Sequence, residues 1–277
     1  MKTTWFGRSA PVPEPITDGP RLVADEVTLG YDKRIISSDL SVAVPDGSFT
    51  VIIGPNACGK STLLRALSRL LAPASGSVLL DGAEIASLPA KEVARRLGLL
   101  PQTSTAPDGI RVADLVARGR FPHQSLIRQW SDDDEAAVVE AMRSTRVDAL
   151  SGRLVDELSG GQRQRVWIAM VLAQQTPLVL LDEPTTYLDI SHQIELLDLC
   201  AQLNETGRTL VAVLHDLNHA FRYADNLVVM KAGEIVAQGA PAEIVDADLI
   251  GDVFSLPCRI IDDPESHTPL VVPKVSR

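Results

Sequence analysis

A continuous stretch, Gly54-Pro55-Asn56-Ala57-Cys58-Gly59-Lys60-Ser61-Thr62, carries the residue types that hold a nucleotide phosphate. Its glycines let backbone N–H groups close around a β-phosphate, and the Lys60 ammonium can neutralise the β- and γ-phosphates. The Ser61 hydroxyl can ligate Mg²⁺. Cys58 lies near Lys60, so a reactive thiol is one interpretation, and a small side chain that simply fits the loop is the favoured one. The stretch predicts a phosphate-binding loop.

Two neighbouring acids, Asp182 and Glu183, could supply the other half of such a site. They follow the apolar run 178–181, which is short for a helix and long enough for a buried parallel strand. Ligands bind at the carboxyl ends of such strands. Asp182 is therefore a candidate for the Mg²⁺ shell, and Glu183 for orienting or deprotonating the attacking water. The alternative is that one of them caps the next helix.

Three isolated residues fit the same chemistry, although each is a weak signal alone. Gln102 follows a predicted strand at 97–100 and could report on Mg²⁺ or the γ-phosphate. His215 ends a predicted strand at 210–214, where a neutral imidazole could contact the γ-phosphate. Tyr31 could stack its ring on adenine. Their ordinary interpretations are a surface glutamine, an incidental histidine and a turn aromatic.

The elements around the phosphate loop have the order that its chemistry requires. The β-branched stretch 49–53 predicts a buried strand before the loop. After the loop, leucines recur at helical spacing and predict a helix, namely Leu63, Leu64, Leu67, Leu70 and Leu71. Strand, glycine loop and helix together are the context in which such a loop binds phosphate.

A second glycine motif, Leu158-Ser159-Gly160-Gly161-Gln162, has no phosphate chemistry of its own. Ser159 can cap a helix that begins near Gln162, whose apolar residues Val166, Ala169, Met170 and Ala173 recur at helical spacing. A helix N-terminus carries free N–H groups and the positive end of the helix dipole, so it can receive an anion. This motif is useful only if it meets a nucleotide held elsewhere.

Composition narrows the class of protein. The 277 residues carry a net charge of −10, which argues against nucleic acid as a principal partner. No apolar run approaches the roughly 18 residues of a membrane span, and the start lacks a secretory apolar core. The three cysteines show no C-x-x-C pairing, which suits a reducing cytosol. The acids 132–135 could suggest a metal site, but Ser131 before them favours a helix start.

The motifs stand in an order that resembles the ATP-binding subunit of an ABC transporter, over about residues 22–272. The resemblance identifies the A-loop, Walker A, Q-loop, signature, Walker B, D-loop and H-loop, in that order, as Tyr31, 54–62, Gln102, 158–162, 179–183, 186–189 and His215. In that family two subunits pair head to tail. The resemblance thus implies that each ATP lies at a composite site built from both subunits. The signature residues Ser159 to Gln162 act on the ATP held by the partner's phosphate loop, and Asp189 of the D-loop also helps to bind ATP at such a site.

The same resemblance implies a fold and a domain order. It is an α/β fold, with a P-loop NTPase (RecA-like) core, an inserted α-helical subdomain and a small antiparallel β subdomain. We expect a mobile tail over 1–21, an ABC ATPase domain over 22–240 and a short extension over 241–277, with the helical insertion at about 103–174. The extension has a helix pattern around 242–253 and a final apolar stretch at 270–272.

Closer similarity points to importers of ferric siderophores, a branch that also serves haem and cobalamin. It is carried by the residues 56–58, 183–193, 214–220 and 222–224. Residues 118–123 are similar to the segment of that branch that lies in the helical subdomain and faces the membrane partner. It implies a homodimer, with ATP and Mg²⁺, at the cytoplasmic face of the membrane. The implied partners are integral membrane permease subunits and, indirectly, an extracytoplasmic substrate-binding protein. The cargo follows from resemblance alone.

Two other functions fit the sequence less well. A soluble ABC ATPase acting on DNA or ribosomes usually has long coiled coils or two ATPase units in one chain, and this chain has neither pattern. A P-loop kinase for small molecules would leave the 158–162 motif without a purpose.

Overall fold

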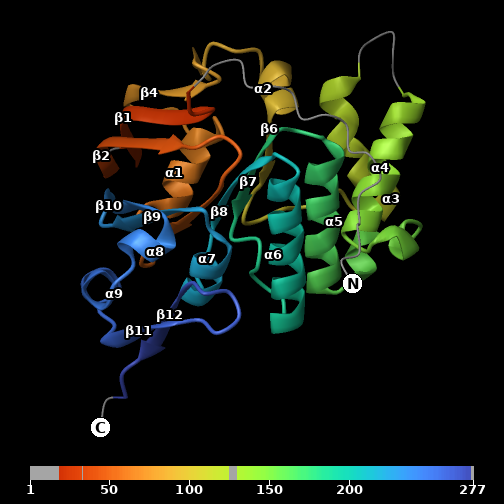
Figure 1. The fold of residues 1–277 in the computed structure, drawn as a ribbon. Coiled ribbons are helices and arrows are strands. Elements are labelled where there is room, and N and C mark those ends of the chain that lie inside the picture. The colour runs from red at the N-terminus through yellow and green to blue at the C-terminus, as the bar shows by residue number, and fades with distance from the viewer. Residues whose placement is uncertain (1–18, 33, 125–129, 276–277) are drawn as a thin grey trace. The chain divides into compact units, whose positions relative to one another are not determined.

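The computed structural model describes residues 19–32, 34–124 and 130–275, which form two units by their internal contacts (Figure 1). We call the first the helical unit; its described residues are 89–124, 130–179 and 185–208. The second is the sheet unit, with 19–32, 34–88, 180–184 and 209–275. The expected mobile tail lies almost wholly outside the described residues. The predicted domain limits stay predictions.

A mostly parallel sheet forms the core of the sheet unit. Within this unit the order is β10 (Glu234–Gly239), β9 (Asn226–Lys231), β3 (Phe49–Ile53), β8 (Thr209–Val213) and β7 (Leu178–Asp182), of which residues 180–182 belong to this unit. β3 pairs in parallel with β8 and with β9, whereas β10 runs antiparallel to β9. All residues of β3, β7 and β8 are buried, as expected for apolar strands covered on both faces. The predicted strands before the loop, before Asp182 and before His215 are confirmed.

The helix after the loop, α1 (Lys60–Leu67), is shorter than its leucine pattern predicts. Leu63, Leu64 and Leu67 are buried on the sheet unit's core, but Leu70 lies beyond the helix and is 63% exposed. Arg69 adopts a positive φ of 65°, a left-handed conformation that ends a helix. The prediction that Leu70 and Leu71 continue the helical stripe is therefore wrong.

A second, antiparallel sheet in this unit has the order β2 (Arg34–Val44), β1 (Leu22–Tyr31), β4 (Ser75–Leu80) and β5 (Ala83–Glu84). β1 pairs antiparallel with both β2 and β4. This sheet confirms the predicted small antiparallel β subdomain. Tyr31 stands at its end as the last residue of β1.

The C-terminal part of the sheet unit contains more structure than its sequence pattern predicts. One helix pattern around 242–253 is divided into α8 (Pro241–Ile244) and α9 (Ala247–Phe254). Asp246 divides them because its carboxylate accepts a backbone N–H and caps α9. The apolar stretch at 270–272 lies in β12 (Pro269–Pro273), which pairs antiparallel with β11 (Cys258–Asp262).

The helical unit is built mainly around three helices that pack against one another, α3, α4 and α5 (Figure 1). Its elements are α2 (Ala90–Arg96), β6 (Leu97–Leu100), α3 (Val112–Ala117), η1 (Arg118–His123), α4 (Asp132–Ser144), η2 (Asp148–Leu150), η3 (Val155–Glu157), α5 (Gly160–Ala173) and α6 (Ile190–Glu205). The helix start predicted after Ser131 is confirmed, since the Ser131 hydroxyl accepts the Asp134 N–H in a capping box. Within the described chain, no group of three or more His, Cys, Asp or Glu residues is arranged to hold a metal ion.

Across the described ranges, no helix is long and apolar enough to cross a membrane.

Candidate nucleotide site

The phosphate loop between β3 and α1 depends on its glycines. A Cβ on Gly54 would lie 2.2 Å from the Met230 carbonyl oxygen, so no larger residue fits there. Gly59, directly before α1, has a φ of +109°, a conformation that glycine adopts readily and other residues rarely adopt. Because Gly59 has no side chain to cap α1, the first N–H groups of the helix are left to another acceptor, such as a phosphate oxygen.

Lys60 is held inside this loop. Its Nζ donates hydrogen bonds to the carbonyl oxygens of Gly54 and Pro55, both at 2.9 Å, and the residue is only 5% exposed. A buried ammonium needs such partners, because an isolated charge is costly to desolvate. The fold therefore fixes a positive charge among the backbone N–H groups of the loop, which is the electrostatic requirement for binding phosphates.

Ser61 and Asp182 form a hydrogen bond within the sheet unit. The Ser61 hydroxyl donates a hydrogen bond to Asp182 Oδ1 at 3.1 Å, and Asp182 is buried at the end of β7. Burial raises the pKa of Asp182, the Ser61 hydrogen bond opposes this, and the neighbouring Glu183 charge adds to it. A cation beside this carboxylate would offset both the desolvation cost of the buried charge and its repulsion by Glu183.

Glu183 and His215 form the second contact of the site. Glu183 Oε1 lies 2.7 Å from His215 Nε2, and the Glu183 side chain is 11% exposed. Glu183 also has a φ of +53°, which is uncommon for a residue with a long side chain. Strained backbone of this kind is concentrated at functional sites, and here it turns the carboxylate towards the imidazole at the strand end.

Tyr31 has a partner that the sequence reasoning missed. The Tyr31 hydroxyl accepts a hydrogen bond from Arg65 at 3.2 Å, and the residue is 42% exposed. Arg65 follows Ser61 by one helical turn of α1, so helical spacing could have placed it on the same face. Its positive charge also acts to lower the pKa of Asp182.

The surroundings of Cys58 disfavour a reactive thiolate in this loop. Cys58 is buried, and burial raises its pKa against the opposing charge of Lys60. The protonated thiol is therefore the form present at neutral pH. This supports the interpretation of Cys58 as a small side chain that fits the loop.

The signature motif lies in the helical unit at the start of α5. The Ser159 hydroxyl accepts the Gln162 N–H at 3.3 Å, and Gln162 Oε1 accepts the Ser159 N–H at 3.2 Å. This reciprocal capping box confirms the predicted cap. Ser159 and Gly160 are exposed, so the helix start is open to an anion.

The D-loop contacts this helix start within the same unit. A Cβ on Gly161 would lie 3.3 Å from the Leu188 side chain. Asp189 caps α6 by accepting the His192 N–H, which with the Ser191 hydroxyl lowers the pKa of Asp189. Gln102 is an exposed residue of the helical unit, after β6.

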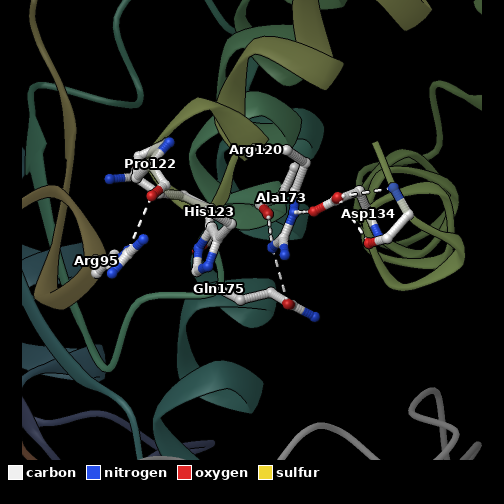
Figure 2. Close-up of polar contacts among 9 residues, drawn as sticks. Arg95, Arg120, Pro122, His123, Asp134, Ala173 and Gln175 are labelled. Carbon is white, nitrogen blue, oxygen red and sulfur yellow. Dashed lines mark hydrogen bonds and ion pairs between the residues drawn. The ribbon is translucent and has the colours of Figure 1, made fainter. Parts of the chain in front are cut away.

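A buried arginine fixes η1 to the end of α5. Figure 2 shows Arg120 between Asp134 on one side and Ala173 and Gln175 on the other. Arg120 Nε donates to Asp134 Oδ1 at 2.8 Å, and its Nη1 donates to the Ala173 carbonyl at 2.8 Å. His123 hydrogen-bonds the Gln174 carbonyl at 2.8 Å, and burial lowers its pKa. These contacts hold the segment in place while Phe121 projects from it, 72% exposed.

Comparison with known proteins decides the family. Residues 37–186, more than half of the chain, match the ABC transporter family. The chain belongs to the ABC transporter family. It is 60% identical over 254 residues to the ferric enterobactin transport ATP-binding protein FepC of Escherichia coli strain K12, covering 91% of this chain and 94% of that protein.

Two further comparisons agree with this ABC assignment. The chain is 53% identical over 250 residues to the probable siderophore transport system ATP-binding protein YusV of Bacillus subtilis strain 168, covering 90% of this chain and 91% of that protein. It also superimposes on a dimeric post-hydrolysis structure of the ATP-binding cassette MJ0796 bound to ADP and Pi. The TM-score is 0.70, with 27% identity, 79% of this chain covered and 98% of that one. The protein is accordingly an ABC ATPase, and it binds ATP.

The sheet unit brings together five of the predicted site features of this ABC ATPase, which are Tyr31, the loop 54–62, Asp182, Glu183 and His215. Gln102, the signature and Asp189 belong to the helical unit. The residue roles inferred from the sequence stay predictions.

Proposed function

We propose that this ABC ATPase hydrolyses ATP at the cytoplasmic face of a membrane to energise uptake of a ferric siderophore through integral permease subunits. The observation that carries the catalytic part is the pair of contacts Ser61–Asp182 and Glu183–His215, which join four candidate residues from two strand ends and a helix start. The cargo is supported by the names of the similar proteins, two of which are ATP-binding proteins for enterobactin or siderophore transport.

The residues of the loop fit a magnesium-bound triphosphate. Ser61 and Asp182 offer a hydroxyl and a buried carboxylate 3.1 Å apart, the hard oxygen donors that Mg²⁺ prefers. When bound there, Mg²⁺ would neutralise phosphate charge. Lys60 supplies a fixed positive charge to the β- and γ-phosphates, and the N–H groups at the start of α1 bind their oxygens. Gln102 is assigned as a further contact to Mg²⁺ or the γ-phosphate.

Glu183 acts on the attacking water in this proposal. Its carboxylate is held by His215 at 2.7 Å, and its positive φ turns it away from the path of β7. A carboxylate within hydrogen-bond reach can orient the water or accept its proton. His215 senses the γ-phosphate at the same place, so that loss of the γ-phosphate on hydrolysis changes the partner of the imidazole. Tyr31, steadied by Arg65, provides a ring for adenine to stack on.

The signature completes the site of a second copy. Its exposed helix start, with the capping box of Ser159 and Gln162, presents N–H groups and the positive end of α5 to an anion. The neighbouring D-loop, with Asp189, lies against the same glycines. In a head-to-tail homodimer, this anion is the γ-phosphate of the ATP bound in the partner's loop.

The permease is proposed to dock on η1. Arg120 and His123 hold this segment on the end of α5 (Figure 2). Phe121 is presented to solvent as a large apolar side chain. Exposed aromatic side chains on a rigid support are frequent anchors of protein interfaces. An extracytoplasmic substrate-binding protein would act through the permease without touching this subunit.

Uptake in cells tests the proposed cargo. Deleting this subunit should abolish uptake of radiolabelled iron from a ferric siderophore and impair growth under iron limitation, while growth on abundant soluble iron continues. A plasmid with the wild-type chain should restore uptake, and the matched Glu183→Gln chain should not. Normal siderophore uptake in the deletion strain, with no substitute ATPase present, would contradict the cargo and direct attention to haem or cobalamin.

A further inference from the structure

The C-terminal hairpin, defined as β11, β12 and the turn 263–268 between them, lies against α7 (Leu217–Tyr223) (Figure 1). α7 begins two residues after His215. A helix of this length has almost no stability of its own, so its position depends on what it contacts. One face buries Ala220 and Phe221 in the sheet unit, where α7 packs on β3.

The other face of α7 is held by the hairpin at both ends of the helix. In the first turn, Asn218 Oδ1 accepts the backbone N–H of Val271 in β12 at 2.8 Å. In the last turn, Arg222 donates to Asp263 Oδ2 at the start of the hairpin turn. Residues four apart lie on the same side of a helix, so these two contacts act on a single face.

Asp263 is built into the hairpin as well as bound to the helix. Its side chain is 5% exposed, and its Oδ1 accepts the Glu265 N–H at 3.0 Å. Its backbone N–H donates to Thr268, and its carbonyl oxygen accepts from His267, both at 2.9 Å. The Arg222 contact is therefore made by a carboxylate whose own position is fixed by the turn.

We propose that the C-terminal hairpin is a positioning element for His215, with Asp263 and Asn218 as positioning residues. The hairpin holds α7, and the Asp216 carboxylate caps the start of α7 by accepting the His219 N–H. Asp216 directly follows His215, whose imidazole lies 2.7 Å from Glu183, so the position of α7 sets the position of the backbone that carries this imidazole. The inference rests on the proposed role of His215 in hydrolysis. It gives the extension 241–277 a part in catalysis, although none of its residues needs to touch the nucleotide.

Steady-state kinetics of the full chain test this. Asp263→Asn weakens the contact with Arg222, and Asn218→Ala removes a single neutral hydrogen bond. We expect each to lower kcat about tenfold, within the loss of up to about a hundredfold that a displacement of about 1 Å can cause. KM for ATP and the amount of ATP bound per chain should change less than about twofold, because the phosphate loop is untouched. The matched control is Asp262→Asn, next in the chain, whose side chain pairs only with the exposed His267 among the contacts described.

A double-mutant cycle separates positioning from general destabilisation. In a His215→Ala background, Asp263→Asn should alter kcat less than about twofold, because the group that the hairpin positions is already missing. Equal losses of kcat in both backgrounds would overturn the inference, and so would unchanged kcat in both Asp263→Asn and Asn218→Ala. If Asp263→Asn fails to fold, Asn218→Ala carries the same cycle.

The His215→Ala chain alone shows which claim has failed. Turnover near wild type in that chain would remove the proposed role of His215, and the inference with it. Low turnover in that chain, with full turnover in the two hairpin variants, would refute the inference and leave the proposed function standing.

Discussion

Replacing Asp134 with asparagine should destabilise the helical unit far more than the same change at Asp132, although both acids lie in the first turn of α4. Asp134 Oδ1 accepts the Arg120 Nε–H at 2.8 Å, and neither side chain is more than 7% exposed. Asp134 Oδ2 also accepts from Ser131 in the capping box. Asp132 is exposed at the first position of the same helix.

The size of the difference follows from burial. Removing one partner of a buried ion pair leaves an uncompensated charge and costs about 3–5 kcal/mol of unfolding free energy. Asparagine keeps an acceptor oxygen for Arg120, so we expect about 3 kcal/mol, the lower end of that range. Asp132→Asn removes only an exposed charge at the positive end of a helix, worth about 0.3–1 kcal/mol.

The pH dependence has a definite sign. Burial alone would raise the pKa of Asp134, but the hydrogen bonds from Arg120 and Ser131 outweigh it and lower the pKa below the ordinary 3.8. A lowered pKa in the folded state stabilises the protein fully above the unfolded value, and this stability is lost as the pH falls through the folded value. The gap between wild type and Asp134→Asn should therefore be constant near neutral pH and shrink below about pH 4.

Urea denaturation at several pH values measures the free energy of unfolding of each variant. Because a chain of two units need not unfold in one step, hydrogen exchange of peptides from α3, α4 and α5 reports on the helical unit separately. We expect exchange in these helices to accelerate in Asp134→Asn and to stay close to wild type in Asp132→Asn. Equal effects of the two variants would refute the argument that the buried pair stabilises the helical unit.

Three other predictions concern the sheet unit. Glu183→Gln should bind ATP, lose most hydrolysis and accumulate as an ATP-bound dimer, because the phosphate-holding groups remain; near wild-type phosphate release would remove Glu183 from its role. Gly54→Ala should lose ATP binding, measured by calorimetry, because its Cβ would lie 2.2 Å from a backbone oxygen, whereas Gly251→Ala, with nothing within 4 Å, should bind normally. Tight binding by Gly54→Ala would show that the loop can shift. Cys58 should resist maleimide in the folded chain at pH 7, since burial raises its thiol pKa; mass spectrometry showing rapid labelling would contradict this.

The elements around the loop could be predicted because their signals are local. The apolar runs that form β3, β7 and β8 each end next to candidate site residues, which are the phosphate loop, Asp182 with Glu183, and His215. All three strands form as expected. The Ser131 and Ser159 caps were likewise predictable, because a capping box needs only residues three positions apart.

The rest depends on contacts between residues that are distant in the sequence. Arg120 gives no local sign of being buried, since its partners Asp134, Ala173 and Gln175 are brought to it by the packing of three helices. The contact between Arg222 and Asp263 joins residues 41 apart. Leucine spacing predicted too long a helix after the loop, because the spacing of apolar residues contains no information on the left-handed conformation of Arg69, which ends α1.

The central claim is that the signature of one copy completes the ATP site of the other, and mixed dimers test it. Lys60→Ala spoils a chain's own phosphate loop, and Ser159→Arg puts bulk and charge at the helix start that faces the partner's ATP. Each homodimer should be inactive. In the mixed dimer both lesions fall on one composite site, and the other site joins an intact loop to an intact signature.

The decisive measurement is nucleotide occupancy and γ-phosphate protection per dimer, with Glu183→Gln in both chains to prevent hydrolysis. The account predicts that the mixed dimer holds one protected ATP, whereas neither parent homodimer does. If mixed dimers hold no more protected ATP than the parent homodimers, the signature does not complete the partner's site, and the head-to-tail arrangement is wrong for this protein.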